Sequence, residues 1–320
     1  MFTEQQNSSL AQTELDEVFR QGYEDTTPPS YATAMTGEIF KIATIDRAAF
    51  IGAVHKGSGL FSKIGEVQAL PTYTAKVGNK FTVSISDFGE GIEISKNLFD
   101  DDQHEEWSAQ VTDLAIMARR TQDFNSFKIF RGAFTTTLTA DGAVLCGSHT
   151  LLGGGTTSNE IVTADISGAS TSALTTGALN VAIRRLATVK SHSNVPMQCV
   201  GDTLVVPTAL YVTARQVSVS ALVPENGNNA VNVFSMDYNI KVYQSVWMGT
   251  EGAADGSDTA WFLLDSKRHS IRRYVRQGVQ TSLRGWEQST NRTLYYQAHF
   301  REEVYAPDYI GIVGARGTTA

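Results

Sequence analysis

Three residues in the middle of the chain have the side-chain types of a hydrolytic triad: Asp141, Ser148 and His149. Such a triad needs its serine exposed on a sharp turn and its base and acid held by a common scaffold. No Gly-x-Ser-x-Gly elbow surrounds Ser148, and the spacing offers no shared scaffold for the three groups. A histidine in a Thr- and Gly-rich loop is more often a structural hydrogen-bond partner. A hydrolase using Ser148 and His149 is therefore only a remote alternative.

Other short motifs also fail the requirements of the sites they suggest. Gly153-Gly154-Gly155 lacks the Lys-Ser/Thr of a phosphate-binding loop. The acidic loop from Gly249 to Asp258 does not have the alternating oxygen ligands of a calcium loop. The six histidines are scattered, and Cys146 and Cys199 lack the spacing of a zinc site. We expect no cofactor, no metal ion and no enzymatic activity.

Composition limits the class of protein. The chain has 320 residues and 42% hydrophobic residues, enough for a sizeable core. Its net charge of −7 argues against wrapping nucleic acid with one dominant basic face. No run approaches the roughly 20 apolar residues that span a bilayer, and residues 1–10 do not resemble a signal peptide. We expect synthesis in a reducing cytoplasm and no membrane partner.

Charge is distributed unevenly, and this suggests contacts between copies. Residues 4–25 carry six acidic residues against Arg20, whereas residues 267–301 carry eight basic residues against Glu287. Charge pairs between subunits give register and specificity even when each adds little stability. The basic stretch also fits non-specific contact with DNA phosphates.

The first hundred residues predict an arm and a hairpin. Residues 8–21 have the pattern of an amphipathic helix, and a second helical segment is expected near Asp46 to Val54. From Tyr73 to Phe88 apolar and polar residues alternate around Gly78-Asn79, which predicts a long hairpin turning at that dipeptide. Because an isolated two-stranded ribbon is marginally stable in water, we expect it to lie on a neighbouring copy.

A long helix is predicted from about Asp102 to Gly132, with acidic residues near its start and basic residues near its end, as the helix dipole favours. After a Thr- and Gly-rich stretch, the pattern predicts a helix at 179–189, a buried strand at 204–206 and a helix opening at Pro207. Strands are expected at 240–248, 261–265 and 294–300. This order predicts an α+β or α/β fold, of which the α+β fold is the one we adopt with the resemblance described next.

With these elements in view, the chain resembles tailed-phage major capsid proteins of the Hong Kong 97-type fold, which encapsulins and the herpesvirus floor share. Arm, hairpin, long helix, compact middle region and late strands follow in that order along nearly the whole chain. Local features resemble the Mu-like head-subunit branch: Asp141-Gly142 with His149, Leu204-Val205-Val206-Pro207, Trp261-Phe262-Leu263-Leu264-Asp265 and Arg284-Gly285.

The resemblance implies a division of the chain. An N-terminal arm would occupy residues 1–60, an extended hairpin loop 61–100, and the spine helix with the first part of a peripheral domain 101–171. An axial domain would follow at 172–268, and residues 269–320 would return to the peripheral domain and its last strand. It leaves no room for a fused scaffolding segment and implies an uncleaved N-terminus.

The resemblance also implies a function. Copies would assemble into hexamers and pentamers of an icosahedral or prolate shell enclosing double-stranded DNA, in a virion assembled in the host cytoplasm. A separate scaffolding protein, a portal and a decoration protein are possible further partners. The residues we expect between subunits are Phe81, Val83, Ile85, Lys76, Lys80, Glu14, Glu17, Arg272, Arg273 and Arg276.

The resemblance leaves two questions, which shell-forming class the protein belongs to and whether its subunits are covalently crosslinked. An encapsulin-type compartment holding a cargo enzyme is the main alternative, because the fold is shared. In some relatives a hairpin lysine joins an asparagine of the next subunit covalently. Lys76, Asn79 and Lys80 lie in the predicted hairpin, but no partner or catalytic acid is identifiable, so we expect no crosslink.

Overall fold

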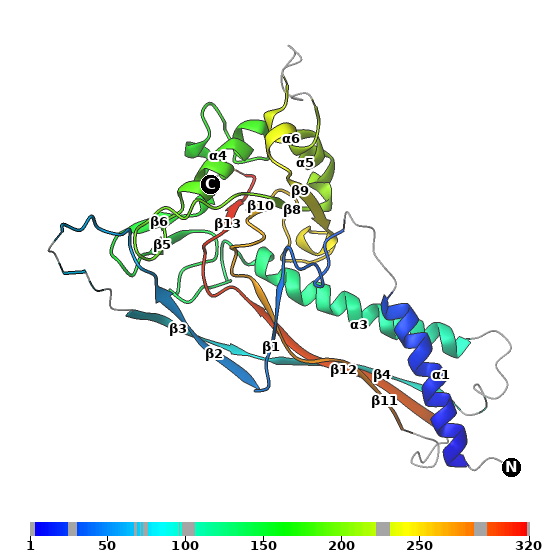
Figure 1. Cartoon of the computed structure of the whole chain (residues 1–320). Coiled ribbons are helices and arrows are strands. Elements are labelled where there is room, and N and C mark those ends of the chain that lie inside the picture. The colour runs from blue at the N-terminus through cyan, green and yellow to red at the C-terminus, as the bar shows by residue number, and fades with distance from the viewer. Residues whose placement is uncertain are drawn as a thin grey trace.

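The computed structural model describes residues 4–24, 31–66, 69–70, 72, 76–95, 97, 106–221, 231–284 and 293–318. It contains two main sheets, one elongated and one compact, and a two-stranded ribbon that extends beyond both (Figure 1). The long helix α3 (Glu106–Arg131) runs from the elongated sheet to the compact one. The described part of the chain is therefore mixed α and β, as its sequence predicts.

The elongated sheet has the strand order β1-β11-β12-β4. Its long central strands β11 (Arg272–Arg284) and β12 (Thr293–Tyr305) pair antiparallel, and β4 (Ser86–Ser95) pairs with β12. The short edge strand β1 (Lys41–Thr44) runs parallel to β11. Residues from the beginning and the end of the chain therefore complete one sheet.

Two helices cover one face of this sheet. In β12 every second residue is buried, from Leu294 to Glu302, because successive strand side chains point to opposite faces. Helix α1 (Glu4–Glu24) and the first half of α3 pack their apolar side chains onto that face. The contributing residues of the helices are Leu15, Phe19, Val111, Leu114 and Ala115.

The compact sheet has the order β7-β13-β10-β8-β9. Its strands are β7 (Glu160–Ile161), β8 (Thr203–Pro207), β9 (Lys241–Ser245), β10 (Trp261–Leu264) and β13 (Ile312–Ala315). Every residue of β8, β10 and β13 is buried, as expected for strands covered on both faces.

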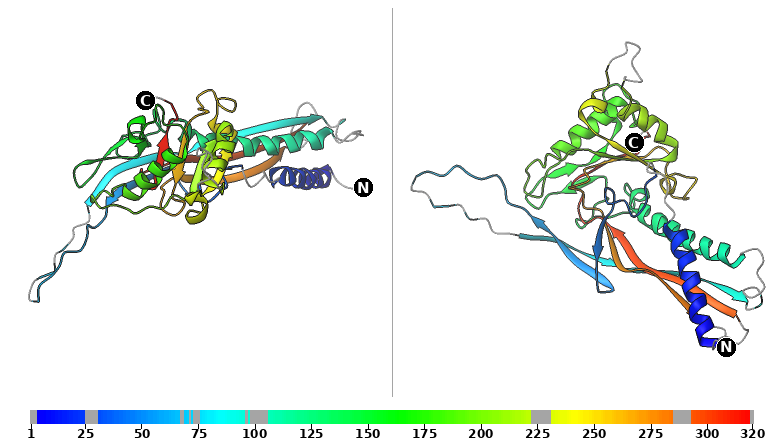
Figure 2. Two further views of the ribbon diagram at one scale, coloured as in Figure 1. Left: turned by 90° about the horizontal axis from the view of Figure 1, so that it is seen from above. Right: turned by 45° about the vertical axis from the view of Figure 1, so that its right-hand side comes forward.

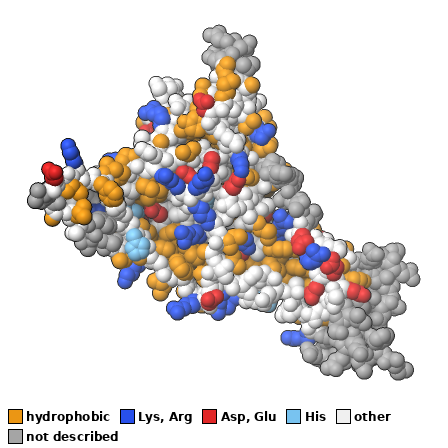
Figure 3. All heavy atoms as spheres, viewed as in Figure 1, with side chains coloured by type: hydrophobic (Ala, Val, Ile, Leu, Met, Phe, Trp, Pro, Cys, Tyr) orange, Lys and Arg blue, Asp and Glu red, His pale blue; other side chains and the backbone are white. Residues whose placement is uncertain are grey.

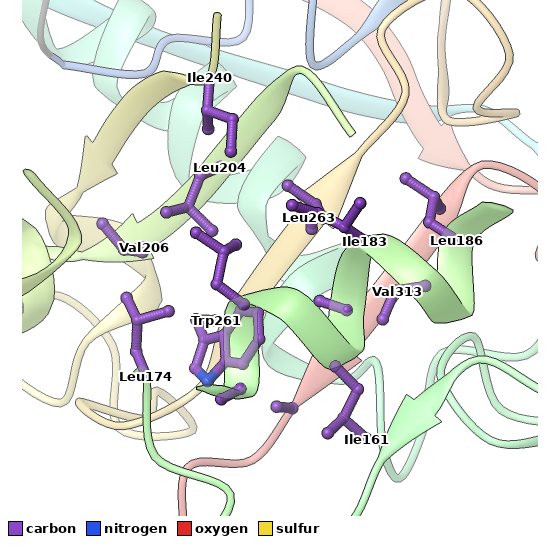
Figure 4. Packing of buried hydrophobic residues seen from close by; sticks show 14 of the residues in the cluster. Ile161, Leu174, Ile183, Leu186, Leu204, Val206, Ile240, Trp261, Leu263 and Val313 are labelled. Atoms are coloured by element: carbon purple, nitrogen blue, oxygen red, sulfur yellow. The ribbon is translucent and has the colours of Figure 1, made fainter. Parts of the chain in front are cut away.

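Helices enclose the compact sheet. Helices α4 (Thr176–Thr188) and α5 (Tyr211–Ser218) pack on one face, where Trp261, Leu263 and Val313 meet α4 (Figure 4). The end of α3 packs on the other face through Phe127 and Phe130. Helix α4 begins at an N-cap, Thr175, whose side chain accepts a hydrogen bond from the backbone N–H of Ala178.

Smaller elements connect these layers. Helix α6 (Val233–Asp237) follows α5, and the strands β5 (Ser148–Thr150) and β6 (Thr156–Ser158) form a short hairpin beside the compact sheet. Three single 3₁₀ turns, η1 (Thr163–Asp165), η2 (Thr208–Leu210) and η3 (Val246–Met248), join neighbouring elements.

The ribbon consists of β2 (Ala49–Lys56) and β3 (Lys76–Ser84), which pair antiparallel. It extends away from both sheets, as Figure 2 shows. After Ile85 the chain continues directly into β4, so it crosses from the ribbon into the elongated sheet. Strand β2 likewise follows β1 after four residues, and Phe50 of β2 packs on Tyr274 of β11, so both strands of the ribbon join the elongated sheet at the same end.

Two sequence predictions about this region were wrong. Gly78-Asn79 is not a turn, because both residues lie inside β3, where β2 supplies the partner strand. A side chain at Gly78 would clash with Leu152 and with the backbone oxygen of Val54, so this glycine allows close packing. Residues 73–75 of the predicted hairpin lie outside the described residues. The helix expected at Asp46 to Val54 is instead largely strand β2.

Most other predicted elements were confirmed. Helix α1 contains the predicted segment 8–21, and α3 ends one residue before the predicted Gly132. Helix α4 and strands β8 and β10 lie where their patterns place them. After Pro207 the turn η2 leads into α5, and the predicted strand at 240–248 divides into β9 and η3.

Candidate assembly surfaces

The residues of the suggested hydrolytic triad do not form a site. His149 Nδ1 lies 2.9 Å from Asp141 Oδ2, but the His149 side chain is completely buried. Ser148 is exposed and precedes His149 on β5, so the two side chains point to opposite faces. Burial opposes the ionisation of Asp141, yet hydrogen bonds from His149 and Thr139 outweigh it and lower the pKa of Asp141 to about 2. The Asp141–His149 pair is a structural contact without access for a substrate.

The described residues hold no group of three or more histidine, cysteine or acidic side chains that could bind a metal ion. Within the same part of the chain, no helix is long and apolar enough to cross a membrane. Both cysteines are free and buried, and burial raises the pKa of both thiols. Neither thiol lies in the exposed, cationic setting that reactive cysteines require.

Phe81, Val83 and Ile85, predicted to contact a neighbouring copy, instead pack within their own chain. Val83 is buried with Tyr274, and Phe81 and Ile85 pack against the same cluster. The Phe81 ring lies 5.3 Å from that of Tyr305. These residues anchor the ribbon to the elongated sheet, because β3 packs this apolar face on Tyr274 and Tyr305 before the chain enters β4. A further contact of the half-buried Phe81 and Ile85 with a neighbouring copy stays a prediction.

The charged residues predicted between subunits have different environments. Lys80 and Glu14 are exposed, whereas Glu17 accepts hydrogen bonds from Arg20 in the same helix. Arg272 is exposed and lies opposite Lys41 in the β1–β11 register, and Arg276 is half-buried. Arg273 is buried and pairs with Glu302 inside the chain, so its charge is neutralised internally. The Lys76 side chain lies outside the described residues.

The sequence reading did not identify the most exposed apolar surface of the ribbon. Beyond β2, Leu60 is 83% and Phe61 98% exposed, and Ile64 and Leu70 are exposed as well. The space-filling view shows hydrophobic side chains at this projecting end (Figure 3). Contiguous exposed apolar side chains mark interaction sites. The available signal was an apolar pair, Leu60-Phe61, directly after the Gly57-Ser58-Gly59 break. We name residues 57–66 the ribbon tip.

The part of the chain from the end of β3 through α3 and the compact sheet to β13 matches a known family. A protein-family model described as phage capsid protein matches residues 79–314, which is most of the chain. The chain belongs to the phage capsid protein family.

Solved structures agree with this capsid fold. The capsid of a native GTA particle matches with a TM-score of 0.57 and 16% identity, over 93% of this chain and 94% of that one. The capsid of cyanophage P-SCSP1u matches with a TM-score of 0.56 and 12% sequence identity, over 93% of this chain and 91% of that one. A virus-like particle from Pyrococcus furiosus matches with a TM-score of 0.55 and 9% sequence identity, over 95% of this chain and 98% of that one. No curated protein matches the sequence.

These comparisons confirm the central predictions. The capsid subunit has the Hong Kong 97-type fold and the function of a major capsid protein, a structural component of a tailed-phage virion that associates with itself into shells. The encapsulin alternative has no better support than the function of a phage capsid protein. None of the comparisons identifies the Mu-like branch, which stays a prediction.

Proposed function

We propose that this subunit forms the hexamers and pentamers of an icosahedral or prolate head that encloses double-stranded DNA, and that the head assembles in the host cytoplasm. In this proposal the role is mechanical and involves no catalysis. The observation that carries it is the ribbon tip, where Leu60 and Phe61 are almost fully exposed to water. Such a surface on an extended ribbon is costly in an isolated subunit and is explained by contact with another copy.

The two sheets suggest how the subunit is arranged in such a head. We propose that the part of the compact sheet within residues 172–268, strands β8 to β10, forms most of the axial domain with α4, α5 and α6; β7 and β13 complete this sheet from outside that range. In the same proposal α3 and the elongated sheet, whose edge strand β1 comes from residues 41–44, form the peripheral domain, and α1 belongs to the arm. The extended loop corresponds to the ribbon, β2 to β3, rather than to residues 61–100 alone.

Charge supports the same arrangement. Exposed Glu14 on α1 and exposed Arg272 on β11 belong to the acidic and basic stretches of the chain. We propose that such residues pair between subunits at the rims of interfaces, where charge pairs set register.

Scaffolding, portal and decoration proteins are further proposed partners. Lys76 and Lys80 are proposed to form no covalent crosslink, so assembled particles should give single subunits on denaturing gels.

The ribbon tip is tested with the double variant Leu60→Asp/Phe61→Asp. Because both side chains are exposed, the variant should fold with unchanged thermal stability and fail to form closed particles in electron micrographs. Ser62→Asp is the matched control, since it adds charge to the same loop without removing an apolar group, and it should assemble. Normal particles from the double variant would contradict the role of the tip.

The contents of the particles separate capsid from compartment. Particles purified from the native source should contain double-stranded DNA protected from nuclease. Protein cargo without DNA in those particles would favour the encapsulin-type alternative instead.

A further inference from the structure

Two loops of the body contact the ribbon at the end where β2 finishes at Lys56 and β3 begins at Lys76, opposite to its attachment on the elongated sheet; we call this end the ribbon root. In the first loop, Leu152 lies against Gly78. A side chain at Gly153 would collide with the backbone oxygen of His192, at 2.8 Å, and would contact the Lys56 side chain at 3.5 Å. In the second, the Ser193 hydroxyl donates a hydrogen bond to the backbone oxygen of Gly57. The position of the ribbon root therefore depends on these two loops, 151–155 and 190–196.

The second loop has a tight, defined shape. Lys190 and Pro196 form an isolated bridge, and the Ser191 N–H donates to the backbone oxygen of Val195. Asn194 at its tip adopts a positive φ of 62°. The Tyr309 hydroxyl donates to the backbone oxygen of Lys190 at 2.8 Å, which ties the loop to the segment before β13.

Behind this loop lies a buried stack of three rings. Tyr309 stacks on His149 with ring centroids 4.2 Å apart, and His192 meets the same tyrosine edge-on at 5.6 Å. His192 is only 5% exposed, and neither of its ring nitrogens has a well-formed hydrogen bond. Its Nε2 lies 3.4 Å from Asp308 Oδ2. Asp308 is held in place because its Oδ1 accepts the Tyr309 N–H.

This geometry gives the two protonation states of His192 different surroundings. Neutral His192 offers Asp308 at most a neutral N–H donor from Nε2, at a separation of 3.4 Å. Protonated His192 forms a charge-assisted contact with Asp308, and charge-assisted hydrogen bonds are the stronger kind. We propose that His192 and Asp308 form a proton-dependent latch, which fixes the ribbon root when His192 is charged and loosens it when His192 is neutral.

The charged and titratable groups around the latch support this direction. Asp308 raises the pKa of His192 above its ordinary value, burial opposes this, and Asp141 adds to the rise. His149 faces the latch across Tyr309, and Lys56 lies beside the backbone of His192. A histidine whose pKa is raised by folding contributes stability that is complete below its unfolded pKa and is lost as pH rises through the folded value. The latch is thus closed in mild acid and loosened in mild alkali.

Hydrogen exchange of the full-length unassembled subunit tests the latch without depending on shell formation. After correction for intrinsic exchange rates, amides of residues 49–57 and 76–84 should exchange several-fold faster at pH 8.5 than at pH 6, because closure of the latch is coupled to protonation of His192. In His192→Gln these amides should exchange at the faster rate at both pH values. Asp308→Asn should behave in the same way.

His299→Gln is the matched control, because His299 is a half-buried histidine of the elongated sheet with Gln277 as its partner. It should keep the pH dependence of the wild type. If His192→Gln does not fold, Asp308→Asn and a histidine NMR titration of the wild type give the answer. The proposal is overturned if the wild-type ribbon exchanges equally at both pH values, or if the difference persists in a folded His192 or Asp308 variant.

Discussion

Arg273 and Glu302 form an ion pair buried under α3, with Arg273 Nε 2.8 Å and Nη2 2.5 Å from the same oxygen, Glu302 Oε2. The pair joins β11 to β12 at the point where the elongated sheet passes below the long helix. Glu302 Oε1 has no hydrogen-bond partner, and burial raises the pKa of Glu302 although Arg273 opposes that rise.

Replacing one residue of this ion pair should lower the free energy of unfolding more than replacing both. Arg273→Met leaves an uncompensated buried carboxylate and should lower the free energy of unfolding by about 3–5 kcal/mol. The double variant Arg273→Met/Glu302→Leu should recover a large part of that loss. Urea unfolding of the unassembled subunit measures both. A single-variant cost below about 1 kcal/mol would show that the pair is not desolvated as the structure indicates.

Asp123 should make stability depend on pH in an unusual direction. Burial raises the pKa of Asp123 to about 6, although the Ala34 N–H and Arg119 oppose the rise. The folded state thus favours the protonated carboxyl, and its contribution is complete below about pH 4 and lost as pH rises through 6. Asp123→Asn should become more stable than the wild type by about 1–3 kcal/mol between pH 4 and 7.5.

Asp141→Asn is the control for Asp123→Asn, because the pKa of Asp141 is shifted in the opposite direction and its effect on stability should change with pH in the opposite sense. Because the pKa of Asp141 is lowered to about 2, its contribution is present above pH 4 and lost as pH falls. Asp141→Asn should therefore be less stable than the wild type at neutral pH. Stability differences that run parallel for the two variants across pH would refute both assignments.

Two glycines with the same backbone conformation should respond differently to alanine. Gly142 and Gly311 both have φ of +79°, but a side chain at Gly142 meets open space. At Gly311 it would lie 2.6 Å from the backbone nitrogen of His269. Gly142→Ala should cost about 1–2 kcal/mol of stability from the left-handed backbone alone, and Gly311→Ala clearly more. Equal melting temperatures would show that the segment around Gly311 can move aside.

Asn159 should be difficult to replace, because it joins three separate segments. Its Nδ2 donates to the backbone oxygens of Leu145 and Ile312, and its Oδ1 accepts the Gly147 N–H. The side chain is completely buried. Asn159→Leu should lower the free energy of unfolding by about 2–4 kcal/mol, since it leaves buried backbone groups without partners. Asn125→Leu, a half-buried position on α3, is the comparison and should cost less.

The sequence was sufficient to predict helices and strands whose apolar residues recur with the spacing of a helix face or form an unbroken buried strand. In α4, Leu179, Ile183 and Leu186 lie on one face of a helix, and in β8 an unbroken apolar run marks a strand covered on both sides. The order of such elements, rather than any single motif, carried the resemblance to capsid proteins.

The sequence was insufficient where a distant strand decided the outcome. Gly78-Asn79 is the strongest local turn signal in its region, yet both residues lie within β3, at a register shift between the pairs Ala53–Lys80 and His55–Val77. Arg273 resembles its basic neighbours in sequence, but Glu302, on the next strand, neutralises it. Which surface an apolar face contacts depends on the tertiary path, so the sequence alone did not show that Phe81 and Val83 pack against Tyr274 of their own chain.

The strand β13 occupies an inner position of the compact sheet, between β7 and β10, although it is among the last residues of the described chain. Synthesis on the ribosome proceeds from the N-terminus, so β10 and β7 must wait for their shared neighbour until residues 312–315 have been made. A prematurely terminated chain would lack the strand that closes this core and would expose two apolar edges. The compact sheet is therefore complete only once residues 312–315 have been made.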